Sequence, residues 1–335
     1  MKFIEEIKRQ RNRGRCLHFD SGKRCNEIIN AHSIQRKHLV EYVAVDGHAY
    51  KINADYKTLK NNNDKVGASK VGVRKNLSTF LGFCKKHDNE VFKDIDDSPL
   101  IPLDKQVMLY AYRCLCREYF VKENSINVCK EYLRKNSVNE NKRIFIEKHL
   151  EGTKNGFSSL EFHKKQFDKS LREKRYNDIE YVAFFSEDKP IIYFSGNLYP
   201  DFDFLGNPLQ DLAVTENIFQ LLTFFSAPTN DGWAYVFAWH RTSTAICRKY
   251  LQSLATSMHK GNSEGDTLFR LIVSCCENHA ISPAWWENLL DKEKDEILNK
   301  VQLMVYPTTP VPPRYLVAGL EGIAKWKFIN VQTNY

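Results

Sequence analysis

Apolar residues recur at three- and four-residue steps through the middle of the chain. The first such stretch runs from residue 104 to about residue 135, with apolar positions at Val107, Tyr110, Ala111, Leu115, Tyr119 and Phe120. A second helix-like stretch covers residues 139–175, where Lys and Glu are interspersed and turn residues are few. This period predicts two long amphipathic helices.

After residue 176 the chain becomes rich in aromatic and β-branched residues. Residues 181–185 and 191–195 predict a first strand pair, with Asp-Lys-Pro at 188–190 between them. Residues 219–225 and 233–239 predict a second pair, joined by a turn-forming segment. This part of the chain is therefore expected to form a sheet.

Helical patterns return toward the C-terminus. We expect helices over residues 243–258 and 266–277, and a third beginning at Ser282-Pro283, because Ser caps a helix and Pro fits its first turn. Residues 307–313 predict a Pro-rich loop. Together with the predicted strands, these elements indicate an α+β protein.

The N-terminal quarter has a different character. Residues 16–92 form short segments broken by Gly and Asn, and the Pro-containing segment 98–102 marks a boundary. We therefore predict a basic domain at residues 1–98, a helical segment at 99–177 and an α+β domain of unassigned role at 178–335.

Charge is distributed unevenly along the 335 residues. Apolar residues make up 42% and charged residues 27%, which is typical of a folded protein. Residues 1–90 hold 19 Lys and Arg against 10 Asp and Glu, a net charge of +9, whereas residues 91–335 hold 30 against 31, a net charge of −1. This asymmetry indicates a nucleic acid, DNA or RNA, as a partner, the alternative being an ordinary solvated surface.

The cysteines and the first residues of the sequence indicate in which cellular compartment the protein is expected. Acidic Glu5 and Glu6 stand where a secretory signal needs an apolar run, and no stretch approaches the ~18 apolar residues of a membrane span. Nine cysteines, an odd number, favour free or metal-bound thiols over disulfides. The sequence thus predicts a cytoplasmic protein that does not interact with membranes.

Three of these cysteines and a histidine have the pattern of a metal site. Cys16 and Cys25 flank a turn-rich loop, and Cys84-x-x-His87 is a tight ligand pair. Two such pairs fit a structural tetrahedral zinc site, the alternative being ordinary buried thiols. The remaining cysteines, Cys114, Cys116, Cys275 and Cys276 among them, are expected to be core thiols.

The same segment resembles the HNH-type ββα-metal endonucleases. The apolar run 28–34 carries His32 after the first cysteine pair, Asn76-Leu77 follows, and residues 83–89 contain the second pair. In that family a zinc knuckle precedes a strand that bears a histidine, and a Cys-containing pair opens the helix. Over about the first 100 residues the chain looks most like a group of uncharacterised bacterial HNH-like zinc proteins.

The resemblance implies a role for each matching residue. His32 would activate water as general base, Asn76 would brace the loop, and Asp88 or Asn89 would bind catalytic Mg²⁺ or Mn²⁺, which stabilises charge on the phosphate. Histidine suits the base because its ordinary pKa of about 6.5 leaves it largely neutral at pH 7. The implied function is a nuclease that hydrolyses phosphodiester bonds in DNA or RNA, with bacterial phage defence as its setting.

Basic residues around the predicted site are candidates for phosphate contacts, although each could instead serve solubility. Phosphate neutralisation releases counterions, so binding through such residues depends on salt. The candidates are Arg9, Arg11, Arg13, Arg15, Arg36, Lys37, Lys85 and Lys86.

Two other interpretations remain open. The family often has an acidic residue before its first histidine, and this chain has Ala31. A degenerate HNH fold would make the protein a non-catalytic zinc module that binds nucleic acid and presents its C-terminal region to a protein partner. A purely structural zinc protein is the third interpretation, in which His32 is a zinc ligand or a buried imidazole. The sequence contains no phosphate-binding loop, dinucleotide-binding motif or nucleophile elbow that would indicate a different class of enzyme.

Overall fold

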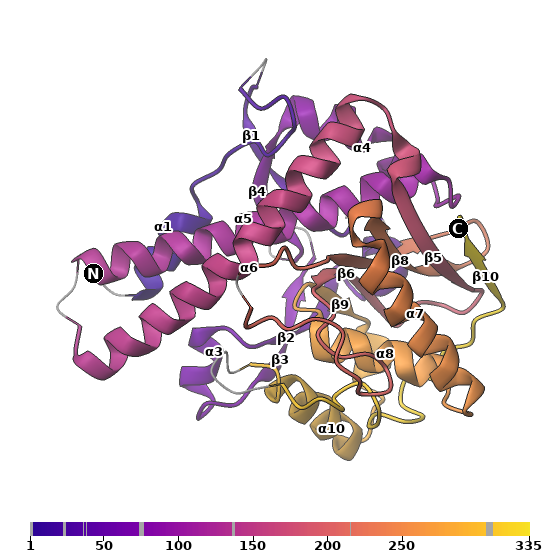
Figure 1. Cartoon of the computed structure of the whole chain (residues 1–335). Coiled ribbons are helices and arrows are strands. Elements are labelled where there is room, and N and C mark those ends of the chain that lie inside the picture. The colour runs from indigo at the N-terminus through magenta and orange to yellow at the C-terminus, as the bar shows by residue number, and fades with distance from the viewer. Residues whose placement is uncertain are drawn as a thin grey trace.

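The computed structural model describes residues 3–22, 25–35, 37, 39–73, 77–135, 138–214, 216–305 and 311–335. Helices and antiparallel sheets are both present, which confirms the α+β prediction (Figure 1). The α-helices are α1 (Phe3–Arg11), α3 (Tyr56–Asn61), α4 (Lys85–Asp96), α5 (Asp104–Lys135), α6 (Glu140–Arg172), α7 (Thr244–His259), α8 (Glu264–Cys275), α9 (Pro283–Trp286) and α10 (Asp291–Gln302). The strands are β1 (Ile28–His32), β2 (His48–Asn53), β3 (Gly67–Gly72), β4 (Thr79–Cys84), β5 (Ile179–Ser186), β6 (Ile192–Leu198), β7 (Leu222–Pro228), β8 (Trp233–His240), β9 (His279–Ile281) and β10 (Asn330–Thr333).

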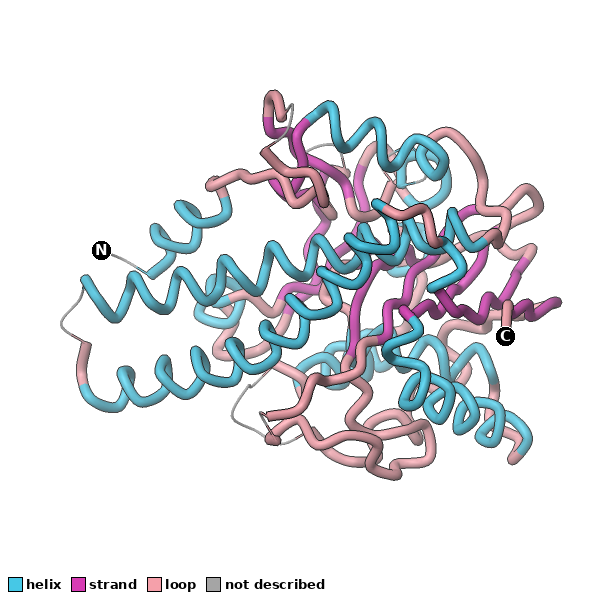
Figure 2. The backbone as a smooth tube through the Cα atoms, turned by 45° about the horizontal axis from the view of Figure 1, so that its top comes forward, coloured by secondary structure: helices cyan, strands magenta, loops and turns pink. Residues whose placement is uncertain are grey.

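Most strands form one antiparallel sheet in the order β10-β5-β8-β7-β6-β9-β2-β3. Helices α5 and α6 pack on one face of this sheet, and α7, α8 and α10 pack on the other. Figure 2 shows the strands as a layer between the two sets of helices. The sheet is therefore the centre of a three-layer arrangement with a hydrophobic core on each side.

Strand β8 shows why the sheet is buried on both faces. Its Trp233, Tyr235, Phe237 and Trp239 belong to the core under α7 and α8, whereas the intervening small residues, Ala234 among them, belong to the core under α5. Side chains alternate between the two faces of a strand, so bulky and small residues sort onto opposite sides. The small side lets the long helix α5 approach closely.

The two predicted long helices are confirmed as α5 and α6. They form an antiparallel pair whose free end extends away from the sheet (Figure 1). Asn139 begins α6 by accepting a hydrogen bond from the backbone N–H of Lys142 at 3.0 Å, a side-chain cap. Long as these helices are, no helix in the described ranges has an apolar stretch sufficient to cross a membrane.

Strands β1 and β4 form a separate two-stranded sheet that leads directly into α4. Ile28 pairs with Cys84 and His32 pairs with Thr79, with a register shift between Ile29 and Ala31. Ala31, Phe80 and Phe83 join the core beneath α5. The N-terminal segment thus contains a ββα unit seated on the central helix.

The hairpin of β2 and β3 does not pack with this ββα unit in one sheet. It extends the large sheet instead, because Tyr50 of β2 pairs with Ile281 of β9. The predicted segments 1–98 and 178–335 therefore share a sheet, and the division of the chain into these domains stays a prediction.

Several predicted elements were placed correctly and one pairing was wrong. The hairpin β7-β8, helices α7 and α8 and the start of α9 match the expected positions. The strands expected at 181–185 and 191–195 exist as β5 and β6, but they do not pair with each other. All eight residues of β5 pair with β8, and β6 pairs with β7 and β9, so β8 and β7 lie between β5 and β6 in the sheet. Residues 307–310 of the expected Pro-rich loop lie outside the described residues.

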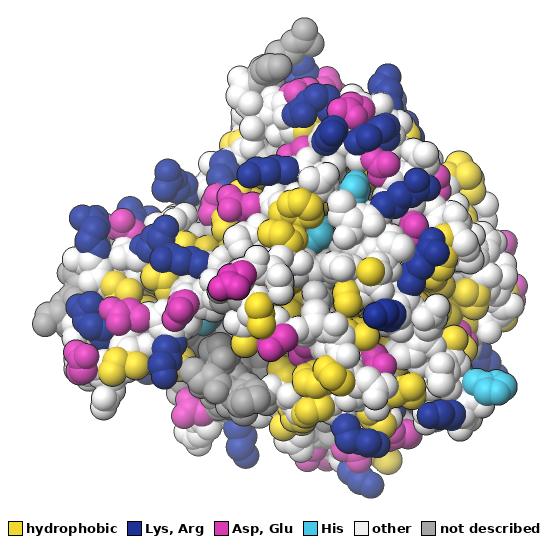
Figure 3. Space-filling model, viewed as in Figure 1, with side chains coloured by type: hydrophobic (Ala, Val, Ile, Leu, Met, Phe, Trp, Pro, Cys, Tyr) yellow, Lys and Arg dark blue, Asp and Glu magenta, His cyan; other side chains and the backbone are white. Residues whose placement is uncertain are grey.

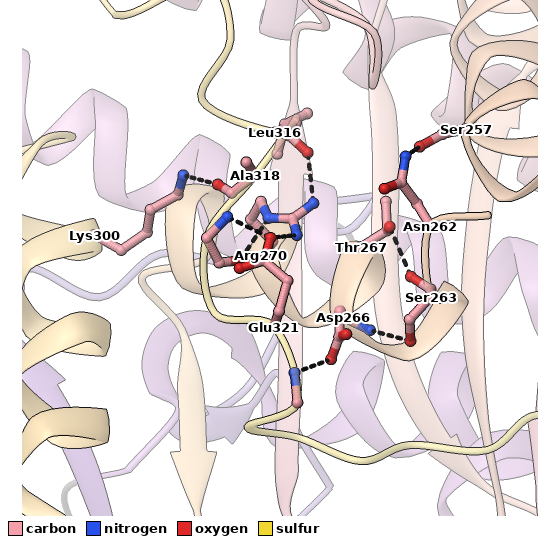
Figure 4. A network of polar contacts seen from close by, with 12 residues as sticks. Ser257, Asn262, Ser263, Asp266, Thr267, Arg270, Lys300, Leu316, Ala318 and Glu321 are labelled. Carbon is pink, nitrogen blue, oxygen red and sulfur yellow. Dashed lines mark hydrogen bonds and ion pairs between the residues drawn. The ribbon is translucent and has the colours of Figure 1, made fainter. Parts of the chain in front are cut away.

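A buried arginine fixes the C-terminal segment onto α8. Arg270 donates to the backbone oxygens of Leu316 at 2.8 Å and Gly319 at 2.7 Å, and its guanidinium also contacts Glu321 at 2.8 Å (Figure 4). Lys300 of α10 donates to the oxygen of Ala318 at 3.2 Å. These contacts hold a segment without regular secondary structure in one place, since its carbonyl groups are satisfied by cations.

The contact between β2 and β9 makes stability sensitive to acid. His279 is fully buried, its Nδ1–H donates to the Cys276 oxygen at 2.8 Å, and its Nε2 accepts from the Ile52 N–H at 3.1 Å. Burial lowers the pKa of His279 to about 4. The folded state therefore resists protonation, and the stability that the neutral ring contributes, about 3 kcal/mol, should be lost as the pH falls from about 6.5 to about 4.

Urea unfolding at pH 7.5, 5.5 and 4.5 measures this loss. His279→Gln keeps a side-chain acceptor but cannot take up the proton, so its free energy of unfolding should fall less steeply with acidification than that of the wild type. Equal pH dependence of the two proteins would contradict the assignment. His259→Gln, at the last residue of α7, is the matched control and should retain the wild-type slope.

Candidate metal centre

The structure brings the four predicted metal ligands together. Ligand atoms of Cys16, Cys25, Cys84 and His87 all lie within 4.8 Å of one another. Nδ1 of His87 lies 3.4 Å from the sulfur of Cys16 and 3.5 Å from that of Cys25. Across the residues that the structure describes, this is the one group of three or more such side chains close enough to share a metal ion.

Each ligand is positioned by local backbone structure. The segment carrying Cys16 runs beside β4, because the N–H groups of Arg15 and Leu17 donate to the oxygens of Leu81 and Gly82 at 2.9 and 2.8 Å. Cys84 ends β4 and directly precedes α4, and the first turn of that helix brings His87 to the same cluster.

The loop between the first two cysteines closes through a glycine. Gly22 has a φ of +85°, a conformation that suits glycine, and its N–H points at the sulfur of Cys25 at 3.2 Å. The turn therefore brings Cys25 back toward Cys16 despite their separation in the sequence.

The donor set and its spacing fit a tetrahedral metal ion. Zinc–sulfur bonds of about 2.3 Å and zinc–nitrogen bonds of about 2.0 Å place a sulfur and a nitrogen about 3.5 Å apart in a tetrahedron. The observed separations of 3.4 and 3.5 Å match this edge. Three thiols and one imidazole are ligands that a metal such as zinc prefers.

The electrostatics of the thiols are consistent with such a role. Burial acts to raise the pKa of Cys84, but N–H groups of His87 and Asn26 directed at its sulfur bring the pKa below the usual thiol value. Burial raises the pKa of Cys16 to about 12. Since thiolates are the binding form, a cation would have to supply the compensating charge for Cys16.

A fifth residue, His18, supports the site and was missed by the sequence analysis. Its ring stacks on that of His87, with centroids 4.1 Å apart and an interplanar angle of 11°. The N–H of Asp20 donates to its Nδ1 at 3.0 Å, which fixes the ring. Burial lowers the pKa of His18 to about 4, so the ring is neutral beside the metal ligand. Its position two residues after Cys16 is the signal that could have found it.

The strand that carries His32 pairs with the strand that ends in Cys84, but His32 lies opposite Thr79, at the other end of this strand pair from the metal ligands. His32 ends β1, and just beyond it the Ser33 N–H donates to the Ser78 oxygen at 2.9 Å, while the Ile34 N–H donates to the Ser78 hydroxyl at 2.8 Å. Ser78 has a φ of +59°, so the backbone turns sharply before β4. Asn76, the predicted bracing residue, lies outside the described residues.

Asp88, predicted to bind the catalytic cation, lies on the side of α4 that faces α5. Burial raises its pKa to about 6, and the charge of Arg113 on α5 opposes this shift. Arg113 is itself engaged by Asp96, to which it donates two hydrogen bonds of 2.8 and 2.9 Å, and it lies over the ring of Phe92. The Oδ1 atom of Asp88 is shielded from solvent and has no hydrogen-bond partner within the described part of the chain.

The predicted phosphate contacts divide into two groups. Arg15 packs over the ring of Phe120 and pairs with Glu123, and burial lowers its pKa, so it holds the N-terminal segment against α5. Arg9 pairs with Glu6 at 2.6 Å, and Lys86 lies 3.8 Å from Glu90.

The second group is open to solvent. Lys and Arg side chains, interspersed with acidic ones, cover the region of β1 and α4 in Figure 3. Arg36 lies outside the described residues. The exposed candidates are Arg9, which is open to solvent although it pairs with Glu6, and Arg11, Arg13, Lys37 and Lys85.

The other cysteines behave as core thiols. Cys114 and Cys116 are buried in α5, where burial raises the pKa of each to about 12. His279 is close to Cys276, but both of its ring nitrogens are engaged by backbone groups.

Comparisons with protein-family models, with curated proteins and with solved structures gave no match. The interpretation of the site therefore rests on the geometry described above. That geometry combines a metal-ligand cluster at the junction of β4 and α4 with a histidine on the paired strand β1.

Proposed function

We propose that the protein is a metal-dependent nuclease whose N-terminal ββα unit, stabilised by one zinc ion, hydrolyses phosphodiester bonds in DNA or RNA. The observation that carries this proposal is the order of the strands, the helix and their functional side chains in the ββα unit. His32 ends one strand, the paired strand ends in Cys84, and the next helix carries His87 and Asp88. This is the order that the resemblance to HNH endonucleases implies.

Each residue has a chemical task in this proposal. His32 takes the proton of the attacking water as general base. The solvent-shielded Oδ1 of Asp88 is a carboxylate oxygen of the kind that binds Mg²⁺. A divalent cation held there supplies positive charge that stabilises the phosphate oxygens during displacement. The tetrahedral cluster fixes the unit rather than reacting.

The direct test is a nicking assay with supercoiled plasmid, and parallel assays with single-stranded DNA and RNA, in Mg²⁺ and in Mn²⁺. Metal-dependent cleavage by the wild-type protein supports the proposal, and cleavage abolished by EDTA but restored by added Mg²⁺ separates it from a contaminating metal-independent activity. The absence of cleavage on every substrate would contradict it.

A second candidate function is a zinc module that binds nucleic acid without cutting it. One observation favours it: Ala31, at the position where the family often has an acidic residue, is buried against an apolar core. An acidic side chain at this position would be desolvated without a charged partner in that core. The unit would then keep the fold and lose a cation ligand.

Both functions require nucleic-acid binding through exposed cations. We expect affinity to fall steeply with salt, and the triple variant Arg11→Gln/Arg13→Gln/Lys85→Gln to reduce the slope of log affinity against log salt by up to about 3. Fluorescence anisotropy with labelled DNA and RNA from 50 to 200 mM salt measures it.

A matched control removes a cation at a distance from this surface. Lys292→Gln on α10 changes a side chain that is 86% exposed and should leave the slope unchanged. Binding by the triple variant with the wild-type affinity and slope would show that these three residues do not contact phosphate.

A further inference from the structure

The large sheet contains a gap beside β9. This strand has only three residues, and it pairs with β6 through residues 192–194 and with β2 through Tyr50. β6 continues to Leu198 and β2 continues to Asn53, beyond the pairing with β9. The two longer strands therefore flank a space in the sheet that β9 does not fill.

A cavity of about 540 Å³ occupies this space. It is lined by β2 on one side and by the end of β6 on the other, and residues from both helical layers contribute to its wall, Lys122 of α5 and Cys275 of α8 among them. Its volume lies in the range typical of small-molecule sites. Apart from the hairpin of β2 and β3, the segments that line this cavity are distant in the sequence from the four metal ligands.

Two lysines are the first chemical feature of the wall. Lys51 of β2 is half-buried as a residue, and desolvation of its ammonium group lowers its pKa. Lys122 of α5 is also half-buried. Among the described residues, no carboxylate lies within 4 Å of either ammonium group. Glu118 of the same wall is paired with Arg117, and Glu277 and Asp55, also in the wall, act on Lys51 only from a longer distance. A desolvated ammonium group such as that of Lys51 is costly when no group pairs with it directly, so an anion in contact with it would be stabilised.

Uncharged polar groups are the second feature. Both amide atoms of Asn197 on β6 are shielded from solvent and have no hydrogen-bond partner within the described ranges, and the same holds for the Ser274 hydroxyl. An unpaired buried amide costs about 1–3 kcal/mol. Asn197 thus offers a donor and an acceptor that no group of the described protein uses.

Carboxylates complete the wall on the other face of the sheet. Asp201 accepts a hydrogen bond from the Tyr315 hydroxyl at 3.2 Å, and the segment that carries Tyr315 is fixed by Arg270 and Lys300. Figure 4 shows this support. Ionised or neutral, such a carboxyl group can accept hydrogen bonds from ligand hydroxyl groups, as acidic residues do with ribose in other sites.

We propose that this cavity binds a small phosphorylated, hydroxyl-bearing molecule, a nucleotide or a sugar phosphate. Lys51 and Lys122 match a phosphate dianion, Asp201 accepts from hydroxyl groups, and Asn197 provides the paired donor and acceptor. The site is separate from the ββα unit and does not rest on the nuclease proposal. Its residues come from β2, α5, β6 and the segment after β6, so the site joins all three predicted segments of the chain.

The test uses the full-length purified protein and isothermal titration calorimetry. The probes are AMP, GMP, CMP and UMP, ribose 5-phosphate, inorganic phosphate and adenosine. We expect at least one nucleotide or ribose 5-phosphate to bind with a Kd below 1 mM, and binding of ribose 5-phosphate as tight as that of the nucleotides would identify the sugar phosphate as the recognised part. Absence of binding by all organic phosphates, or equal binding of AMP and adenosine, would overturn the proposal, as would binding of inorganic phosphate as tight as that of any organic phosphate.

Variants connect the binding to this cavity. Lys51→Met should weaken binding of the phosphorylated probe at least ten-fold, because a charge-assisted contact is lost, and Asn197→Leu should weaken it by a similar factor. Lys60→Met, the same change at an exposed position of the β2–β3 connection, should bind as the wild type does. Thermal melts of all variants show whether they are folded. Wild-type affinity in both folded cavity variants would exclude this cavity as the site.

Discussion

Replacing Cys84 by serine is expected to remove the metal from the protein and to unfold the ββα unit. Cys84 ends β4 and directly precedes α4, so it links the cluster to both elements. Structural zinc sites contribute roughly 10–16 kcal/mol of apparent binding free energy in zinc-finger peptides, and that energy becomes folding energy where the site does not exist in the unfolded chain. We therefore expect zinc to fall from one ion per chain to less than a tenth, with a large loss of thermal stability.

Elemental analysis of the purified protein and hydrogen exchange of β1, β4 and α4 measure the two effects. Cys129→Ser is the matched control, since it changes a buried cysteine of α5 outside the cluster and should leave the zinc content unchanged. The double variant Cys25→Ser/Cys84→Ser removes two ligands, one from each sequence pair. Zinc retained at one ion per chain in this double variant would show that the four residues do not hold the metal.

Replacing His32 by alanine is expected to abolish nucleic-acid cleavage while leaving zinc content and nucleic-acid affinity close to wild type. His32 is not one of the four clustered ligands, and a general base contributes typically 10²–10⁴-fold to the rate. We therefore expect at least a hundred-fold slower cleavage in the plasmid assay. Asp88→Ala should also slow cleavage, and higher Mg²⁺ or Mn²⁺ should partly restore it, because weakened cation binding is overcome by mass action.

His48→Ala is the control for this experiment, because it removes an exposed histidine of β2 and should cleave at the wild-type rate. Loss of zinc or unfolding in His32→Ala would identify His32 as a structural residue. A wild-type protein that binds nucleic acid with the expected salt dependence but never cleaves it would establish the non-catalytic zinc module, with the buried Ala31 as the physical reason.

The sequence was sufficient for features that depend on local spacing. The long helices α5 and α6 follow from apolar residues at helical intervals, and Asn139 marks the start of the second. The metal ligands follow from two cysteines on either side of a turn-rich loop and from the tight Cys84-x-x-His87 pair. Such features need only neighbouring residues and the chemistry of their side chains, so a linear pattern contains them.

The tertiary structure decided what depends on contacts between distant segments. Nothing local indicates that β2 joins β9 instead of β1, because a strand edge can pair with any edge of matching register. The same holds for Asp88 facing Arg113. The cavity beside β9 exists only because one strand of the assembled sheet is shorter than its neighbours, and desolvation of Lys51 and Asn197 arises only when both helical layers close over that gap.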